Sequence, residues 1–205
     1  MAKKLLALGE DGRIVLKLPG GQVQPLPERE RAYAFLLIDC SLSMAGSRLI
    51  QAKEGSLAFA REALKKGYSV GLIRFAGTAE VLCYPKDGLD ALESKLQRLG
   101  VAGGTNMTDA LDLAVRELAP LSGARVIVIA TDGEPDSRSS SLQAAQRART
   151  AGIDIIAIGT EDADKGFLAL LATRFDLLVS VASNNLKTGI SEAAKLLPRA
   201  SCAKK

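Results

Sequence analysis

From residue 33 onward, short apolar runs alternate with longer amphipathic segments. Continuous apolar runs of four to eight residues are typical of strands buried on both faces, whereas apolar residues at every third or fourth position indicate helices. These patterns predict strands at 34–38, 70–75, 78–84, 125–130, 153–158 and 177–181. They predict helices at 48–66, 89–99, 108–118, 140–150, 166–173 and 186–197.

The alternation of strand and helix predicts a mostly parallel sheet with helices on both faces. The tight turn at Ala76-Gly77 is too short for a crossover, so strand 78–84 should run antiparallel to its neighbour. The expected fold class is therefore α/β: a Rossmann-like, open, mostly parallel six-stranded sheet with strand order 3-2-1-4-5-6, in which the third strand is antiparallel.

The first 31 residues have a different pattern. Residues 14–18 form a strand-like run, Pro19-Gly20-Gly21 is a turn signal, and residues 22–24 could run back. We predict an N-terminal hairpin arm and linker at 1–31, an α/β domain at 32–198 and a basic tail at 199–205. The alternative is that the arm adds an edge strand to the main sheet.

Composition narrows the classes of function. The chain has 205 residues, of which 47% are hydrophobic, enough for one domain with a substantial core. It has no histidine, which excludes Ser-His-Asp and Cys-His catalysis and a histidine zinc site. Only 4% of residues are aromatic and the net charge of +4 equals the four lysines at the chain ends, so we expect no nucleic-acid partner.

The compartment is inferred from what the sequence lacks. The N-terminal residues 1–8 lack the long apolar stretch of a signal peptide, and no apolar run reaches transmembrane length. The three cysteines, Cys40, Cys83 and Cys202, show no CxxC spacing, and we expect the first two to be structural thiols. We expect a reduced, cytoplasmic setting and no membrane partner.

Candidate chemistry gathers where the predicted strands end. Asp39, Ser41 and Ser43 follow the first strand of the sheet, and Asp132 follows the fourth. Ligands of open parallel sheets bind beyond the carboxyl ends of the strands, where the strand order reverses. With the expected strand order, Asp39 and Asp132 face one crevice, and the glycine-rich turn before Thr105 lies between them in sequence.

This set offers carboxylates and hydroxyls but no nitrogen or thiolate donor. Such hard oxygen donors suit Mg²⁺ or Mn²⁺ and disfavour zinc or copper. Five short side chains on three loops could supply three direct bonds and two water-bridged bonds to an octahedral ion. The sixth position would be left open to water or to a partner.

At these residues the sequence resembles the von Willebrand factor type A (VWA) domain family over about residues 32–197. The metal-ion-dependent adhesion site (MIDAS) of that family is written DxSxS, then a Thr on a second loop and an Asp on a third. The corresponding residues are Asp39, Ser41, Ser43, Thr105 and Asp132. Leu42 departs from the glycine of many members, but it occupies a variable position and leaves the ligands unchanged.

The resemblance implies that Ser41, Ser43 and Thr105 bind the metal directly and that Asp39 and Asp132 act mostly through water. Neutral hydroxyls leave much of the ion's charge uncancelled, which attracts a Glu or Asp carboxylate of a partner protein. We therefore expect a non-enzymatic, Mg²⁺-dependent protein-interaction module, a scaffold or a subunit of an intracellular complex. Relatives of this kind also imply an AAA-type ATPase as a possible partner.

Three alternatives remain open. A magnesium-dependent phosphohydrolase also places an Asp after its first strand, but it usually needs a second Asp two residues on, where this chain has Ser41. A dinucleotide-binding oxidoreductase would need a GxGxxG motif after that strand, which is lacking. The third alternative is a VWA structural subunit whose metal site is unused.

For the segment 105–109, a helix N-cap at Thr108 could coexist with a ligand role of Thr105.

Overall fold

The computed structural model describes residues 5–8, 14–17, 23–25, 31–132 and 134–198. These residues belong to two compact units. The strands before residue 26 lie in the first unit, and residues 31–198 lie in the second. The predicted basic tail, 199–205, and the turn at Pro19-Gly20-Gly21 are outside the described residues.

The first unit contains an antiparallel sheet in the order β1-β2-β3, with β1 at Leu5–Leu8, β2 at Ile14–Lys17 and β3 at Val23–Pro25. The β2–β3 pair corresponds to the predicted hairpin, with Lys17 opposite Val23. Strand β1 was not predicted. Within the described residues the three strands form a sheet of their own, in place of the alternative edge strand of the main sheet.

The second unit is built on what we call the main sheet. Its described strands have the order β6-β5-β4-β7-β8-β9, which confirms the predicted order. Neighbouring strands are parallel except for β6, which is antiparallel to β5. The strands are β4 Ala32–Asp39, β5 Tyr68–Phe75, β6 Ala79–Cys83, β7 Ala124–Thr131, β8 Asp154–Thr160 and β9 Leu178–Val181.

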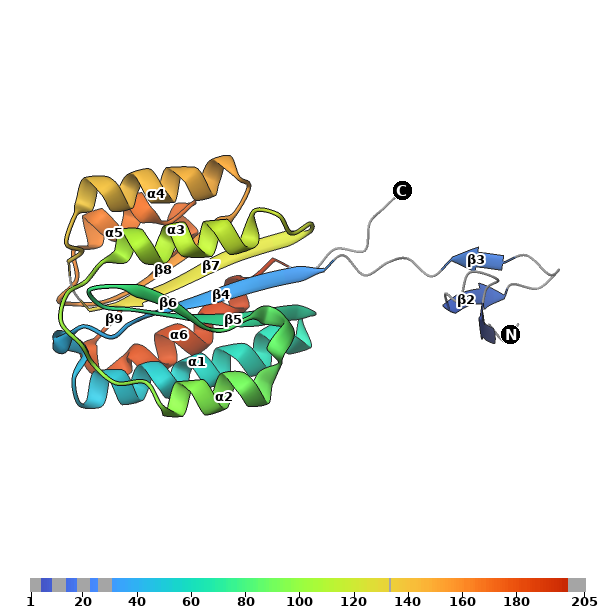
Figure 1. Ribbon diagram of the computed structural model, residues 1–205, viewed down its shortest axis with the longest axis horizontal. Helices are drawn as coiled ribbons and strands as arrows, with labels where there is room; N and C mark the ends of the chain where they lie inside the picture. The colour runs from blue at the N-terminus through green and yellow to red at the C-terminus, as the bar shows by residue number, and fades with distance from the viewer. Residues whose placement is uncertain (1–4, 9–13, 18–22, 26–30, 133, 199–205) are drawn as a thin grey trace. The chain divides into compact units, whose positions relative to one another are not determined.

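Helices cover both faces of the main sheet (Figure 1). One face carries α1 Ser47–Lys65, α2 Leu89–Gln97 and α6 Leu186–Leu196. The other face carries α3 Met107–Leu118, α4 Arg138–Thr150 and α5 Lys165–Leu171. Every predicted helix is present. Helix α4 begins two residues earlier than predicted, because the Ser137 hydroxyl accepts a hydrogen bond from the Ser140 amide and caps it.

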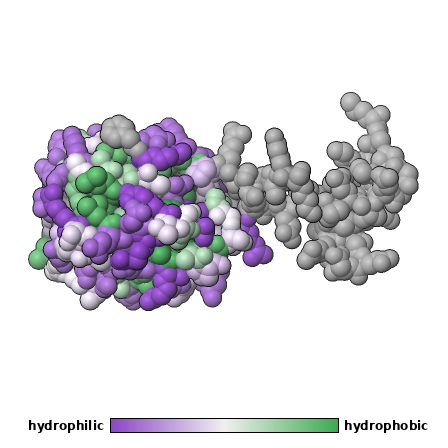
Figure 2. All heavy atoms as spheres, turned by 90° about the horizontal axis from the view of Figure 1, so that it is seen from above, coloured by the Kyte–Doolittle hydropathy of each residue, from purple (hydrophilic) through white to green (hydrophobic). Residues whose placement is uncertain are grey.

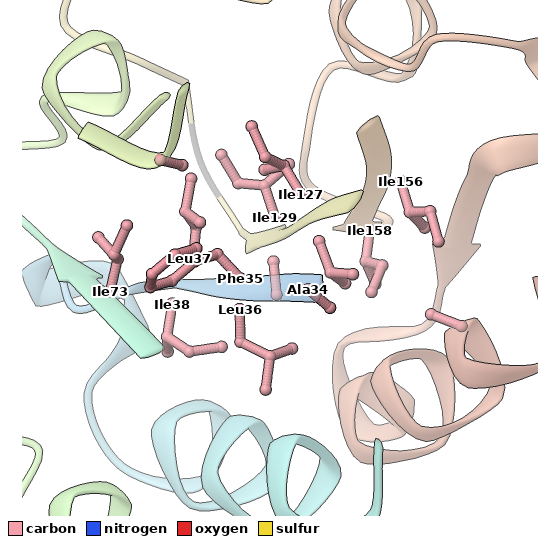
Figure 3. Packing of buried hydrophobic residues seen from close by; sticks show 14 of the residues in the cluster. Ala34, Phe35, Leu36, Leu37, Ile38, Ile73, Ile127, Ile129, Ile156 and Ile158 are labelled. Carbon is pink, nitrogen blue, oxygen red and sulfur yellow. The ribbon is translucent and has the colours of Figure 1, made fainter. Parts of the chain in front are cut away.

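The core lies on both sides of the central strand β4. Phe35, Leu36, Leu37 and Ile38 are all fully buried. Side chains alternate between the faces of a strand, so Leu36 and Ile38 point toward α1 while Phe35 and Leu37 point to the opposite side (Figure 3). This double burial explains the continuous apolar run in the sequence and fixes the register of β4 between β5 and β7.

The surface of the second unit is mixed. Figure 2 shows hydrophilic residues interspersed with small hydrophobic areas on one face. Among the residues described, the most exposed large apolar side chain is Leu42, at 65%, in the loop after β4. None of the helices in the described part of the chain combines the length and the apolar character needed to cross a membrane.

The chain leaves β4 toward β5 on one side and β7 lies on its other side, so the strand order reverses between β4 and β7. At such a reversal the loops that follow the two strands diverge and leave a crevice at the carboxyl edge of the sheet. The candidate residues of the sequence analysis lie on the loops at this edge.

Candidate metal centre

Asp39 is the last residue of β4 and is fully buried. Its two carboxylate oxygens are held by different segments. Oδ1 accepts a hydrogen bond from the Ser41 amide at 2.8 Å, and Oδ2 accepts one from the Thr131 hydroxyl at 2.6 Å. Thr131 ends β7, so this carboxylate connects the carboxyl ends of the two strands that flank the reversal.

Burial sets the electrostatics of Asp39. Loss of solvation raises the pKa of its carboxyl group above the ordinary value of 3.8, and the nearby charge of Asp132 raises it further. The hydrogen bonds from Thr131 and Ser41 oppose this rise in pKa but do not cancel it. The ionised carboxylate is therefore in an unfavourable environment, and a cation placed beside it would stabilise the charged form.

The two serines connect this carboxylate to Asp132. A short 3₁₀ turn at Leu42–Met44 follows Ser41, closed by the Met44 amide bonding to the Ser41 carbonyl at 3.0 Å. The turn brings the Ser41 and Ser43 hydroxyl oxygens to 2.9 Å from each other. The Ser43 hydroxyl donates to Oδ1 of Asp132 at 2.8 Å, and the Asp132 side chain is fully shielded from solvent.

Arg48 completes the surroundings of Asp132, and sequence analysis missed it. Its guanidinium donates through Nη1 to Oδ2 of Asp132 at 2.5 Å and through Nη2 to Oδ2 of Asp162 at 2.5 Å. The hydrogen bond to Asp132 raises the pKa of Arg48 above its ordinary value. The available signal was its position as the second residue of α1, because a cation in the first turn of a helix opposes the helix dipole and needs a counter-charge.

The Thr105 loop is held by main-chain hydrogen bonds. The Ala102 amide donates to the carbonyl of Cys40 at 2.8 Å, and the Gly77 amide donates to the carbonyl of Gly103 at 2.6 Å. Gly104 has φ of 85°, and a Cβ atom there would lie 2.6 Å from the Cα atom of Gly77. The loop therefore needs a glycine at 104 both for its backbone conformation and for this close approach.

Asp136 attaches Thr105 to the loop that follows β7. The Thr105 amide donates to Oδ1 of Asp136 at 3.0 Å, and the Asp136 amide donates back to the Thr105 carbonyl at 3.1 Å. Asp136 is nevertheless an exposed residue. The alternative of a helix N-cap at Thr108 does not hold: α3 begins at Met107, and Asn106 caps it by accepting from the Asp109 amide at 3.1 Å.

The structure joins four of the five candidate residues by hydrogen bonds. Asp39, Ser41, Ser43 and Asp132 belong to one continuous set of hydrogen bonds. Thr105 lies on a loop bonded to the segment after β4 and to the segment after β7, but in the described part of the chain its hydroxyl makes no hydrogen bond to the other four. Among the described residues no group of three or more His, Cys, Asp or Glu side chains forms a metal cluster.

The arrangement presents neutral hydroxyl oxygens flanked by two buried carboxylates. Hydroxyl and carboxylate oxygens are hard donors suited to small divalent cations. The pairing of Asp132 with Arg48 shows that this part of the edge already accommodates a positive charge. The neighbouring Cys40 thiol is buried, and burial raises its pKa to about 11, so it is not a nucleophile at neutral pH.

Comparison with known structures identifies similar folds. The VWA domain of the type V pili tip protein Mfa5 from Porphyromonas gingivalis matches with a TM-score of 0.73 at 16% identity, covering 82% of this chain and 95% of that one. Proximal thread matrix protein 1 from the mussel byssus, solved with a zinc-occupied MIDAS motif, matches with a TM-score of 0.66 at 17% identity, covering 83% and 47%. At these identities the likeness shows the fold alone.

Sequence comparison finds nearer relatives. UPF0353 proteins of Mycobacterium bovis and Mycobacterium tuberculosis are each 34% identical over 155 residues, which cover 64% of this chain and 46% of theirs. The match thus spans about half the length of those proteins. The family profile of the von Willebrand factor type A domain matches residues 35–192. With this profile covering most of the chain and the matching sheet order, the chain belongs to the von Willebrand factor type A domain family.

Proposed function

We propose that this chain is a metal-dependent protein-interaction module. Ser41, Ser43 and Thr105 would bind Mg²⁺ or Mn²⁺ directly, and Asp39 and Asp132 would bind it mostly through water. The open position of the ion would take a Glu or Asp carboxylate of a partner protein. Family membership supports this reading, because VWA domains are interaction and adhesion modules that often use such a site.

One observation carries the proposal. Three oxygen-bearing side chains from loops 89 residues apart in sequence, Ser41, Ser43 and Asp132, are joined within hydrogen-bond distance. Buried polar groups are costly unless they are satisfied, and a strand end could satisfy simple capping needs with far fewer of them. The Thr105 loop is bonded to the segments after β4 and after β7, which supports including the Thr105 hydroxyl in the proposed ligand set.

The charge of the ligands explains why a partner would be captured. A centre whose directly bonded ligands are hydroxyls keeps most of the positive charge of the ion. An anionic side chain is then attracted to the open position, and the buried carboxylates behind it hold the ion in place. The exposed Leu42 beside the serines offers apolar contact area around that position. An AAA-type ATPase is one candidate partner class.

An interaction role accounts for these residues better than the hydrolase alternative. Ser41 stands where a phosphohydrolase would carry its second Asp, and the sequence contains no histidine to act as a general base. We therefore include in the proposal that the chain is not an enzyme. Absence of phosphate release from an aryl phosphate in the presence of Mg²⁺ is the expected result.

Calorimetric titration with Mg²⁺ and Mn²⁺ tests the metal site. The wild-type chain should take up one ion, and Ser43→Ala should weaken uptake strongly. The matched control is Asp112→Asn, which removes a carboxylate bound to Arg147 at 2.8 Å on the α3–α4 surface. Zinc should be titrated as well, because it occupies the site of the mussel protein. Equal uptake by wild type and Ser43→Ala would contradict the proposal.

A co-purification experiment tests the partner. The immobilised wild-type chain should retain a partner in Mg²⁺ and release it on addition of EDTA, and Asp39→Ala should retain none. Identification of the retained protein by mass spectrometry would show whether it is an ATPase. Retention that survives both EDTA and Asp39→Ala would remove the metal bridge from the proposal.

A further inference from the structure

Arg48 is a cation in a position that ordinarily disfavours one. It is the second residue of α1, where the free amides of the helix already create positive potential. Its side chain is only 27% exposed, and its guanidinium lies between two carboxylates, those of Asp132 and Asp162. The ion pairs with these two carboxylates hold the Arg48 side chain in this electrostatically unfavourable position.

The two pairs of Arg48 are unequal. The Asp132 side chain has no exposed surface, whereas that of Asp162 is 53% exposed. Exposed ion pairs are screened by water and contribute little, while charges shielded from solvent interact strongly. The electrostatic effect of Arg48 is therefore concentrated on Asp132, whose other oxygen accepts from Ser43.

Arg48 stays protonated at any pH at which the protein is folded. It thus adds one positive charge to the centre whatever else is bound there. Its effect on affinity must have opposite signs for the metal ion and for the partner carboxylate of the proposed function. A fixed cation opposes the arrival of a metal ion and favours the arrival of a carboxylate.

We propose that Arg48 is an internal counter-ion of the centre, which weakens binding of the metal alone and strengthens capture of an acidic group on the metal-loaded centre. The proposal rests on the metal-dependent function above and names a residue that tunes it. In the metal-free chain Arg48 neutralises Asp132. In the loaded chain Arg48 and the ion share the carboxylate of Asp132, so the charge of Arg48 adds to that of the ion and makes metal and acidic ligand bind cooperatively.

The variant that tests this is Arg48→Gln, which keeps a hydrogen-bond donor but removes the charge. Mn²⁺ affinity is measured by calorimetry with and without an excess of acetate, the simplest carboxylate probe, using the full chain. Arg48→Gln should bind Mn²⁺ alone roughly tenfold more tightly than wild type, a usual size for coupling between sites. The increase in Mn²⁺ affinity caused by acetate should be smaller in Arg48→Gln than in wild type.

Two further variants separate charge from structure. Arg48→Lys keeps the charge but loses the two-nitrogen fork, so both of its Mn²⁺ measurements should stay closer to wild type than those of Arg48→Gln. Arg138→Gln is the matched control, because Arg138 also bridges two carboxylates, Glu134 at 2.5 Å and Asp164 at 2.6 Å, but does not touch the five candidate ligands. It should leave both Mn²⁺ measurements unchanged. Thermal melting in EDTA checks that each variant is folded.

The outcomes distinguish the two proposals. If wild type binds Mn²⁺ and Arg48→Gln binds it with equal or lower affinity, or if the acetate effect is unchanged, Arg48 is not a counter-ion and the metal site stands. If only Arg48→Gln binds Mn²⁺, Arg48 blocks the site in the wild-type chain, which overturns metal-dependent capture by the wild type and with it the cooperative role of Arg48. Failure of both chains to bind Mn²⁺ overturns both proposals.

Discussion

In the central strands, buried apolar residues give way to buried polar residues from one position to the next at the carboxyl end. Ile38 is fully buried among apolar side chains, and Asp39, the next residue of β4, is as fully buried but carries a carboxyl group. In β7 the apolar run at 126–130 is followed by buried Thr131 and Asp132. The strand interiors gain stability from burial, whereas the ends bury polar groups at a cost in stability that the proposed metal site would offset.

The largest effect on stability is expected in the interior. Leu36→Ala should lower the free energy of unfolding by about 2–5 kcal/mol, because it leaves a cavity among fully buried side chains. Urea denaturation measures this change. Ile50→Ala, at a side chain that is 57% exposed, should change stability by no more than about 0.5 kcal/mol. The Mn²⁺ affinity of the folded fraction should be the same in both variants. A loss of affinity confined to Leu36→Ala would mean that metal binding depends on the strand interior as well as on the strand ends.

At the carboxyl end of β4, removing a buried group should have the opposite effect on the stability of the metal-free chain. Asp39→Asn should weaken metal binding about 10–100-fold, as loss of a group that holds a metal through water or hydrogen bonds commonly does. The metal-free variant should be more stable than wild type at neutral pH, because it no longer buries a charge. The amide retains both hydrogen bonds, since the Thr131 hydroxyl can accept instead of donating. Calorimetry and urea denaturation in EDTA measure the two effects, and a less stable metal-free variant would contradict the proposed cost.

The same variant makes a prediction for pH. The pKa of Asp39 is raised in the folded chain, so the folded state holds this proton more tightly than the unfolded state. The destabilisation by ionised Asp39 is therefore complete above its folded pKa and disappears as the pH falls through that value toward 3.8. The stability advantage of Asp39→Asn in EDTA should shrink on acidification. An advantage that grows toward acid pH would show that the pKa is lowered instead.

Two glycines with the same φ test whether the position of the Thr105 loop matters to the metal site. Gly104 and Gly88 both have φ of 85°, but a Cβ atom at 104 would clash with Gly77, whereas at 88 it would meet nothing within 4 Å. Each Gly→Ala change should cost about 1–3 kcal/mol of backbone strain. Only Gly104→Ala should displace the Thr105 loop and weaken Mn²⁺ binding. Equal Mn²⁺ affinities in the two variants would mean that the position of this loop does not matter to the site.

The smallest effect is expected at an exposed ion pair. Asp112→Asn removes the partner of Arg147 on the α3–α4 surface, where both side chains are more than two-fifths exposed. Such pairs contribute about 0–1 kcal/mol. Thermal melting should show little change, and metal binding should show none. A larger loss of stability would mean that surface charge contributes more to this fold than burial suggests.

Sequence patterns predicted the main sheet well, because double burial makes strands such as β4 continuous apolar runs with clear ends. The same strand ends identified Asp39 and Asp132 as neighbours across the reversal. The patterns did not predict Arg48, whose role depends on side-chain reach between α1 and the loop after β7. They also missed the Thr131 hydrogen bond to Asp39 and the two bonds between Asp136 and Thr105, because these join segments distant in sequence. Strand β1 was missed because its four residues, LLAL, have no strand-specific pattern.

Anomalous scattering from crystals grown with Mn²⁺ tests most directly the central claim that these loops bind a metal ion. The account predicts a single strong peak within coordination distance of the hydroxyl oxygens of Ser41, Ser43 and Thr105, with Asp39 and Asp132 reaching it mainly through water. A peak elsewhere on the molecule, or a peak at this edge that the three hydroxyls do not contact, would contradict it.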